Sequence, residues 1–117
     1  MAISLTKFIL PLGLAGLVSA CSGDVGGFAA YDSLKGPRAE GVTIDFIADP
    51  TLGNPQSKSV TTGNNGIYST SLRTGRYIVD FADPSLDHCP GAAPPGGQVY
   101  LVVQAAGPNT ANICIDN

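Results

Sequence analysis

The sequence predicts an all-β domain, a sandwich of about seven short antiparallel strands, and three observations support this fold class. Fifteen glycines and nine prolines interrupt the 117-residue chain at short intervals. The apolar runs between them alternate with polar residues or are rich in β-branched and aromatic residues. After residue 21, no segment has the roughly 3.6-residue apolar spacing of an amphipathic helix. Because one sheet cannot bury its apolar face alone, two stacked sheets are expected.

The expected strands are separated by residues that favour turns. Asn and Gly accept positive φ, so Gly63-Asn64-Asn65-Gly66 is expected to form a tight turn. The segment over residues 83–97 contains four prolines and three glycines and is expected to be a long loop. The strands themselves are expected at residues 25–32, 42–48, 57–62, 67–72, 76–82, 98–105 and 110–116.

Alternation within these strands selects the apolar core. Val42, Ile44 and Phe46 share one face of the second strand, opposite to Thr43 and Asp45. The chain has no tryptophan, so the cysteine–tryptophan–cysteine pattern of immunoglobulin domains is absent. The expected core consists of Val42, Ile44, Phe46, Tyr68, Leu72, Tyr77, Val79, Phe81, Leu101, Val103 and Ile113.

The first 20 residues have the layout of a secretory signal peptide. Lys7 precedes an uncharged apolar run over residues 8–20, and small residues close the run. This run of about 13 residues is shorter than the roughly 20 that a membrane-spanning helix needs. We therefore expect a cleaved signal peptide at residues 1–20, with a buried N-terminal helix of the fold as the alternative.

The end of this run, Val18-Ser19-Ala20-Cys21, resembles the lipobox of bacterial lipoproteins. The resemblance implies cleavage between Ala20 and Cys21 and lipidation of the Cys21 thiol with palmitate-type acyl chains. It also implies a lipid-anchored protein of the bacterial cell envelope, in the outer membrane if two membranes are present, because Ser22 and not Asp follows the cysteine. The alternative is an ordinary signal peptide cut after Ala20. Residues 21–24 would be a short tether, and residues 25–117 the folded domain.

The middle of the chain carries a second resemblance, in the stretches GVTIDF and VTTGNNGIYSTSLRTGRYIVDF. These are similar to the carboxypeptidase regulatory-like, prealbumin-like (transthyretin-like) repeat. The resemblance implies a prealbumin-like β-sandwich, a fold that hosts structural, adhesive and binding modules, and it implies no reaction. The matching residues are Gly41, Val42, Thr62, Gly66, Tyr68, Leu72, Gly75, Tyr77 and Val79.

The two other cysteines are expected to pair. If Cys21 is lipidated, Cys89 and Cys114 remain together in an exported domain, where disulfides form and persist. A Cys89–Cys114 disulfide would tie the long loop to the final strand. Two buried thiols are the alternative.

The charge balance argues against nucleic acid as a partner. The chain has a formal charge of −3, which becomes about −4 when Lys7 leaves with residues 1–20. Along the sequence no basic cluster is present that could bind phosphate or anionic lipid. The expected partners are the membrane, through the anchor on Cys21, and an envelope protein, a peptide or a glycan.

We expect no enzyme, no cofactor and no metal site. His88 is the only histidine, and its neighbour Cys89 is better used in a disulfide than as a nucleophile. Asp83, Asp87 and His88 lie in the proline-rich loop, and with Asp80 they could gather a calcium ion, although their spacing matches no compact calcium loop. We take this loop as a candidate binding loop, with a solvated acidic loop as the alternative.

The function expected from these features is a non-catalytic, membrane-anchored envelope lipoprotein with a structural or binding role. One alternative is a lipoprotein component of a secretion or pilus-type assembly. Another is a small hydrolase, but the sequence has no catalytic triad, no informative carboxylate pair and no metal cluster.

Overall fold

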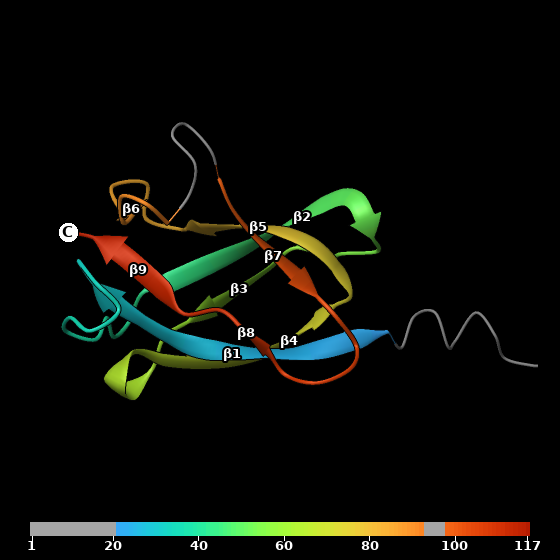
Figure 1. The fold of residues 1–117 in the computed structure, drawn as a ribbon, viewed down its shortest axis with the longest axis horizontal. Helices are drawn as coiled ribbons and strands as arrows, with labels where there is room; N and C mark the ends of the chain where they lie inside the picture. Colours follow the sequence, from blue (N-terminus) through green and yellow to red (C-terminus); the bar gives the residue numbers. More distant parts are fainter. Residues whose placement is uncertain (1–20, 93–97) are drawn as a thin grey trace, which may run out of the picture.

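The computed structural model describes residues 21–92 and 98–117, so the expected signal peptide lies outside the described residues. The described chain is all-β, and its two sheets pack face to face (Figure 1). One sheet has the order β4-β1-β9-β6, with β8 also paired to β1, and the other has the order β3-β2-β5-β7. The strands are β1 (Ser22–Tyr31), β2 (Thr43–Gly53), β3 (Lys58–Thr61), β4 (Ile67–Arg73), β5 (Gly75–Phe81), β6 (Asp87–His88), β7 (Val99–Val103), β8 (Asn109–Thr110) and β9 (Ile113–Asp116).

Not all of the strands are antiparallel, which corrects the expectation for the C-terminal part. The strand expected at residues 110–116 is divided into β8 and β9, and both run parallel to β1. The reason is a crossover, since the chain leaves the second sheet after β7 and enters the first sheet beside β1. Between β8 and β9, the Ala111 N–H donates to the Gly26 carbonyl, and the Asn112 side-chain oxygen accepts from the Phe28 N–H. A side chain thus continues the ladder where the strand is interrupted.

Two segments that were expected to lie outside the strands form parts of strands. The tether expected at residues 21–24 lies in β1 from Ser22 onward, because Ser22 pairs with Arg73 at the end of β4. Asp87 and His88, expected in the loop over residues 83–97, form β6 on the edge of β9. Residues 93–97 of that loop lie outside the described residues.

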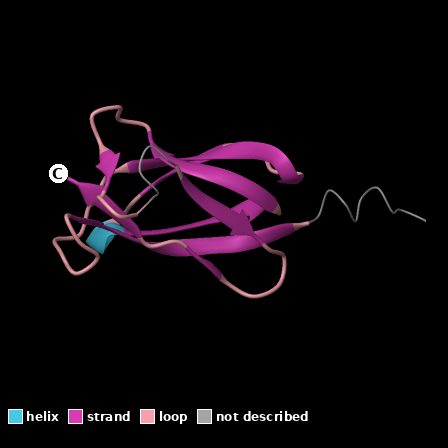
Figure 2. Cartoon of the chain, turned by 45° about the horizontal axis from the view of Figure 1, so that its top comes forward, coloured by secondary structure: helices cyan, strands magenta, loops and turns pink. Residues whose placement is uncertain are grey.

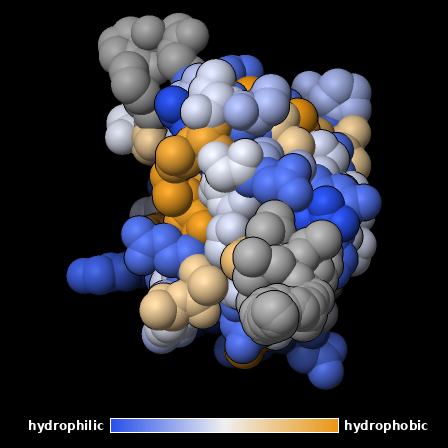
Figure 3. Space-filling view, turned by 90° about the vertical axis from the view of Figure 1, so that its right-hand side faces the viewer, coloured by the Kyte–Doolittle hydropathy of each residue, from blue (hydrophilic) through white to orange (hydrophobic). Residues whose placement is uncertain are grey.

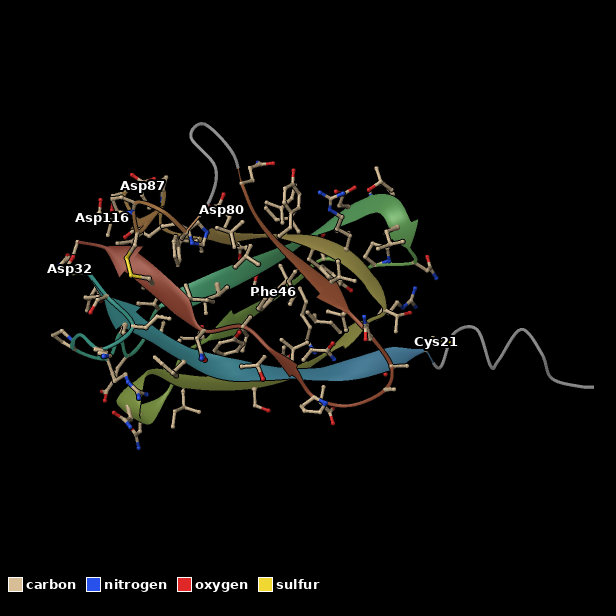
Figure 4. All side chains as sticks on the ribbon, in the orientation of Figure 1. Cys21, Asp32, Phe46, Asp80, Asp87 and Asp116 are labelled. Carbon is tan, nitrogen blue, oxygen red and sulfur yellow. A yellow bond between two sulfur atoms is a disulfide. The ribbon has the colours of Figure 1, made fainter. Side chains whose placement is uncertain are left out.

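The two sheets bury their facing side chains in one core, with Phe46 at its centre (Figure 4). The Phe46 ring lies 6.1 Å from that of Tyr68 and 6.5 Å from that of Tyr77, the latter edge-on at 87°. The expected core residues are all buried except Leu101, which is partly buried against the others. The structure adds Val25, Ala29, Ala39 and Ile115 to the core.

The turn expected at Gly63-Asn64-Asn65-Gly66 is present as a short 3-10 turn over Asn64–Gly66, drawn in cyan in Figure 2. Asn65 has φ +60° and Gly66 has φ +68°, the left-handed conformation that these residue types tolerate. Thr62, a buried polar residue, precedes the turn. Its hydroxyl donates to the Ala39 carbonyl at 2.6 Å and accepts from the Val42 N–H at 3.0 Å, so it fixes the segment between β1 and β2.

Cys89 and Cys114 form a disulfide, which confirms the expected pairing. Their Cα atoms are 5.4 Å apart, and the Cys89 N–H donates to the Cys114 carbonyl at 3.1 Å. The bond joins the segment after β6 to β9. It therefore holds the short β6 edge against the strand that pairs with β1.

Removal of this disulfide is expected to destabilise the domain strongly. The loop that it closes spans 25 residues, and in the chain-entropy model such a bond contributes about 3 kcal/mol. The double variant Cys89→Ser/Cys114→Ser should lose about this amount in urea unfolding, and the wild-type protein should lose the same amount when reduced. Unchanged unfolding midpoints in both experiments would contradict a stabilising role.

Tyr68→Phe should lower stability and also change its dependence on alkaline pH. The Tyr68 hydroxyl donates to the Ala111 carbonyl at 2.5 Å, and a lost hydrogen bond of this kind costs about 1 kcal/mol. Burial raises the pKa of Tyr68 well above its ordinary value of 10.0. In the unfolded chain Tyr68 therefore loses its proton at a lower pH than in the folded protein. The free energy that protonated Tyr68 contributes to folding is fully present below about pH 10, and it is lost as the pH rises further.

Urea unfolding between pH 8 and pH 11 measures both effects. The wild type should lose more stability over this range than Tyr68→Phe does. Tyr100→Phe, at an exposed side chain, controls for the removal of one tyrosine. Parallel pH profiles for the wild type and Tyr68→Phe would contradict the prediction.

Candidate functional site

The sandwich has two chemically different ends. Figure 4 places Cys21 at one end and the carboxylates Asp32, Asp87 and Asp116 at the other, with Asp80 between that end and Phe46. We call these the Cys21 end and the acidic end. The strands run from one end to the other, so the position of a residue along its strand determines the end at which it lies.

The Cys21 end is built by the start of β1 and the turn between β4 and β5. Cys21 is exposed, and its carbonyl accepts a hydrogen bond from the Thr74 N–H at 3.2 Å. Ser22 lies opposite Arg73 in the ladder. The residue at the expected lipidation position is therefore held on the body of the sheet, with no spacer between it and the fold.

In the expected binding loop, the side chains of Asp83 and His88 bind other groups of the protein. Asp83 accepts hydrogen bonds from both the N–H and the hydroxyl of Ser85, which lower the pKa of its carboxyl, the hydroxyl contributing most. The ring of His88 lies 4.7 Å from that of Phe81, and its Nε2 is 2.7 Å from the Val79 carbonyl oxygen. Because a carbonyl can only accept, Nε2 carries the proton. His88 thus fastens β6 to β5.

These residues do not converge on a common point. Asp87 lies opposite Asp116 in the β6–β9 pair, and like charges in this position repel each other. Cys89 is used in the disulfide, so it is not a nucleophile beside His88. Over residues 21–92 and 98–117, no three or more His, Cys, Asp or Glu side chains are grouped so as to hold a metal ion. The same residues include no helix long and apolar enough to cross a membrane.

The outer face of the second sheet carries an apolar row that sequence analysis missed. Ile47, Ile78 and Tyr100 stand side by side across β2, β5 and β7. Tyr100 and its neighbour on the same face, Val102, are each 45% exposed. The signal was present in the sequence, because if Leu101 faces inward, alternation turns Tyr100 and Val102 outward.

One end of this row is covered by a charged side chain. The Arg76 guanidinium lies 4.0 Å from the centre of the Tyr100 ring and 3.5 Å from an Asp49 carboxylate oxygen. The Asp49 carboxyl has a lowered pKa, mainly through hydrogen bonds from the Thr51 side chain and backbone and to a lesser extent through Arg76. β7 ends the sheet, so the apolar row reaches an edge strand.

A shallow open pocket of about 490 Å³ lies between the edges of β3 and β4, near the start of β1. Most of its lining residues are polar or basic, with apolar surface, including Leu72, between them, and they come from three separate parts of the chain. We call it the β3–β4 pocket. It is lined by Ser22, Gln56, Ser57, Lys58, Ser71, Leu72 and Arg73.

Comparison with known proteins gives information on the fold alone. No family model matches the chain, and no curated protein matches it. The structure is similar to the crystal structure of a DUF3823 family protein from Parabacteroides merdae ATCC 43184, with a TM-score of 0.55 and 19% sequence identity. The similarity covers 82% of this chain and 46% of that protein, so this chain spans less than half of its length. The likeness supports the all-β sandwich architecture.

Proposed function

We propose that the protein is a lipid-anchored, non-catalytic protein of the bacterial envelope that works through structural or binding contacts. The observation that carries the proposal is the position of Cys21. The residue that ends the lipobox-like stretch is exposed, and it lies at the end of the sandwich opposite the acidic end. We also propose that the sandwich is prealbumin-like, since Tyr68 and Tyr77 of that resemblance lie in the core.

This placement would hold the domain directly on the membrane. Each buried CH₂ of an acyl chain contributes about 0.8 kcal/mol, so two or three chains anchor a protein stably. Since β1 begins at Ser22, no spacer would separate the sandwich from the bilayer. The acidic end would then point away from the membrane, toward the compartment in which partners are met.

Cys21→Ser is expected to abolish both lipidation and membrane retention, because serine cannot form the thioether. The measurement is fractionation of cells together with metabolic labelling by an acyl-chain analogue. Ser69→Ala, at an exposed serine of β4 outside the β3–β4 pocket, retains the Cys21 thiol and serves as the control, which should stay labelled and in the membrane fraction. If Cys21→Ser remains in the membrane fraction and labelled, the anchoring proposal fails.

A second candidate function is a component of a larger envelope assembly, and the β7 edge favours it. An apolar edge strand pairs readily with another strand unless it is covered or charged, and β7, with the sequence VYLVV, carries no charge. In such an assembly a partner strand would extend the second sheet beside Tyr100 and Val102.

Val102→Lys should abolish such strand addition, because it places a charge on the apolar edge. Ile67→Lys is the matched control, since Ile67 is also an exposed apolar residue, 53% exposed, but lies on β4 at an edge of the other sheet. Cross-linking in the native membrane, followed by mass spectrometry of the linked peptides, should lose β7 cross-links only in Val102→Lys. Equal β7 cross-links in both variants would reject this candidate.

A further inference from the structure

We propose that the β3–β4 pocket binds the phosphate group of an anionic lipid headgroup in the membrane that holds the protein. This inference rests on the proposed lipid anchor, because the anchor is what would keep the pocket at a bilayer surface. The occupant is identified by four features of the structure: the donors in the pocket, their fixed positions, the charges around them and their distance along the chain from Cys21.

The pocket offers donors that suit a phosphate. Lys58 and Arg73 supply the two positive charges, and three serine hydroxyls and the Gln56 amide add neutral donors. None of the described residues that line it is acidic. An arginine fork and a lysine ammonium beside hydroxyl groups are the groups with which proteins commonly bind phosphate.

Lys58 is fixed across the gap between the two sheets. It begins β3 in the second sheet, and its ammonium donates to the Ser71 carbonyl on β4 of the first sheet, at 3.1 Å. Arg73 lies two residues further along β4, opposite Ser22. The two cations therefore approach one pocket from different sheets, although they are distant in the sequence.

The other basic residues of the described chain lie away from the pocket. Arg76 binds Asp49 and covers Tyr100. Arg38 lies 3.8 Å from the centre of the Phe28 ring and donates to the Asn65 carbonyl. Lys35 is exposed in the turn that follows β1. Lys58 and Arg73 are therefore the two cations of the pocket at the Cys21 end.

The acidic groups near the pocket do not line it. Asp24, which lies opposite the pocket residue Ser71 in the β1–β4 pair, lines a separate shallow pocket with Asn109. Asp45 accepts a hydrogen bond from the Ser59 hydroxyl at 2.6 Å. Figure 3 looks onto the Cys21 end, whose coloured surface is mixed, with hydrophilic groups beside a hydrophobic strip. The strongly acidic end lies opposite, so an anionic bilayer would attract the pocket and repel the far end.

The position of the pocket favours a headgroup over a small soluble ligand. Ser22 lines the pocket and directly follows Cys21, so an acyl chain on Cys21 would bring the pocket to headgroup level. The pocket is open to one side, which suits a group presented on a surface. Near an anionic bilayer, each Lys or Arg strengthens binding by about fivefold, and two by about 30-fold.

The test uses the lipidated protein, purified from its own membrane and reconstituted into phosphatidylcholine vesicles. The vesicles contain a trace of either phosphatidylglycerol or phosphatidylcholine with a photoreactive headgroup. The wild type should cross-link to phosphatidylglycerol in preference, at pocket residues. Lys58→Gln/Arg73→Gln should lower this yield to that of the phosphatidylcholine probe. The matched control, Lys35→Gln/Arg38→Gln, removes the same charge at the other end and should leave the yield unchanged.

Three outcomes would overturn the proposal. These are equal cross-linking of the two lipids, an equal loss in the control variant, and saturation of the pocket by inorganic phosphate with no preference for the lipid. The intact mass of the purified protein shows independently whether Cys21 carries acyl chains. If Cys21 is not lipidated, the intact mass shows this before reconstitution. If the pocket does not bind the headgroup, the cross-linking yield of the lipidated protein shows it. Thermal unfolding of each variant shows that it is folded.

Discussion

β1 has hydrogen-bonded neighbours on both of its edges, and the rest of the structure depends on the room that its glycines leave for the second neighbour. A Cβ atom at Gly27 would overlap the carbonyl of Ala111, and one at Gly23 would overlap that of Gln104. The segment after β7 could not lie against β1 if these residues had side chains. Without that contact β9 would lose its pairing with β1, and the β6–β9 pair with its Cys89–Cys114 disulfide would no longer be joined to the rest of the first sheet.

The sequence predicted the inward side chains of strands that bury one face and expose the other. β2 and β5 alternate apolar and polar residues, so their inward side chains could be predicted from their order alone. β1 was harder, because Ala29, with only a methyl group, lies in the core, and the glycines that β1 needs for close approach weaken the strand pattern. The parallel pairing of β8 and β9 with β1 could not be predicted, because it follows from a crossover between the two sheets and leaves no local sequence pattern.

The same distinction applies to the candidate site. The disulfide could be predicted, because the number of cysteines and the expected compartment restrict the pairing. The β3–β4 pocket could not. Its two cations, Lys58 and Arg73, belong to different sheets and meet only because the edges of β3 and β4 lie side by side. In the loop over residues 83–97 the sequence predicted ligand side chains whose polar groups the structure uses within the fold. His88 and Asp83 were candidate ligands, but they bind backbone and neighbouring groups of the protein itself.

The pairing of β1 with β9 also has a consequence for the way an exported chain would fold. β1 is the first described strand and β9 the last, so the first sheet cannot be completed until nearly all of the described chain is present. Contacts between such distant segments form slowly, because the intervening chain must first be closed into a loop. If the chain is exported with its N-terminus first, the first sheet would be completed only after nearly all of the described chain has crossed the membrane.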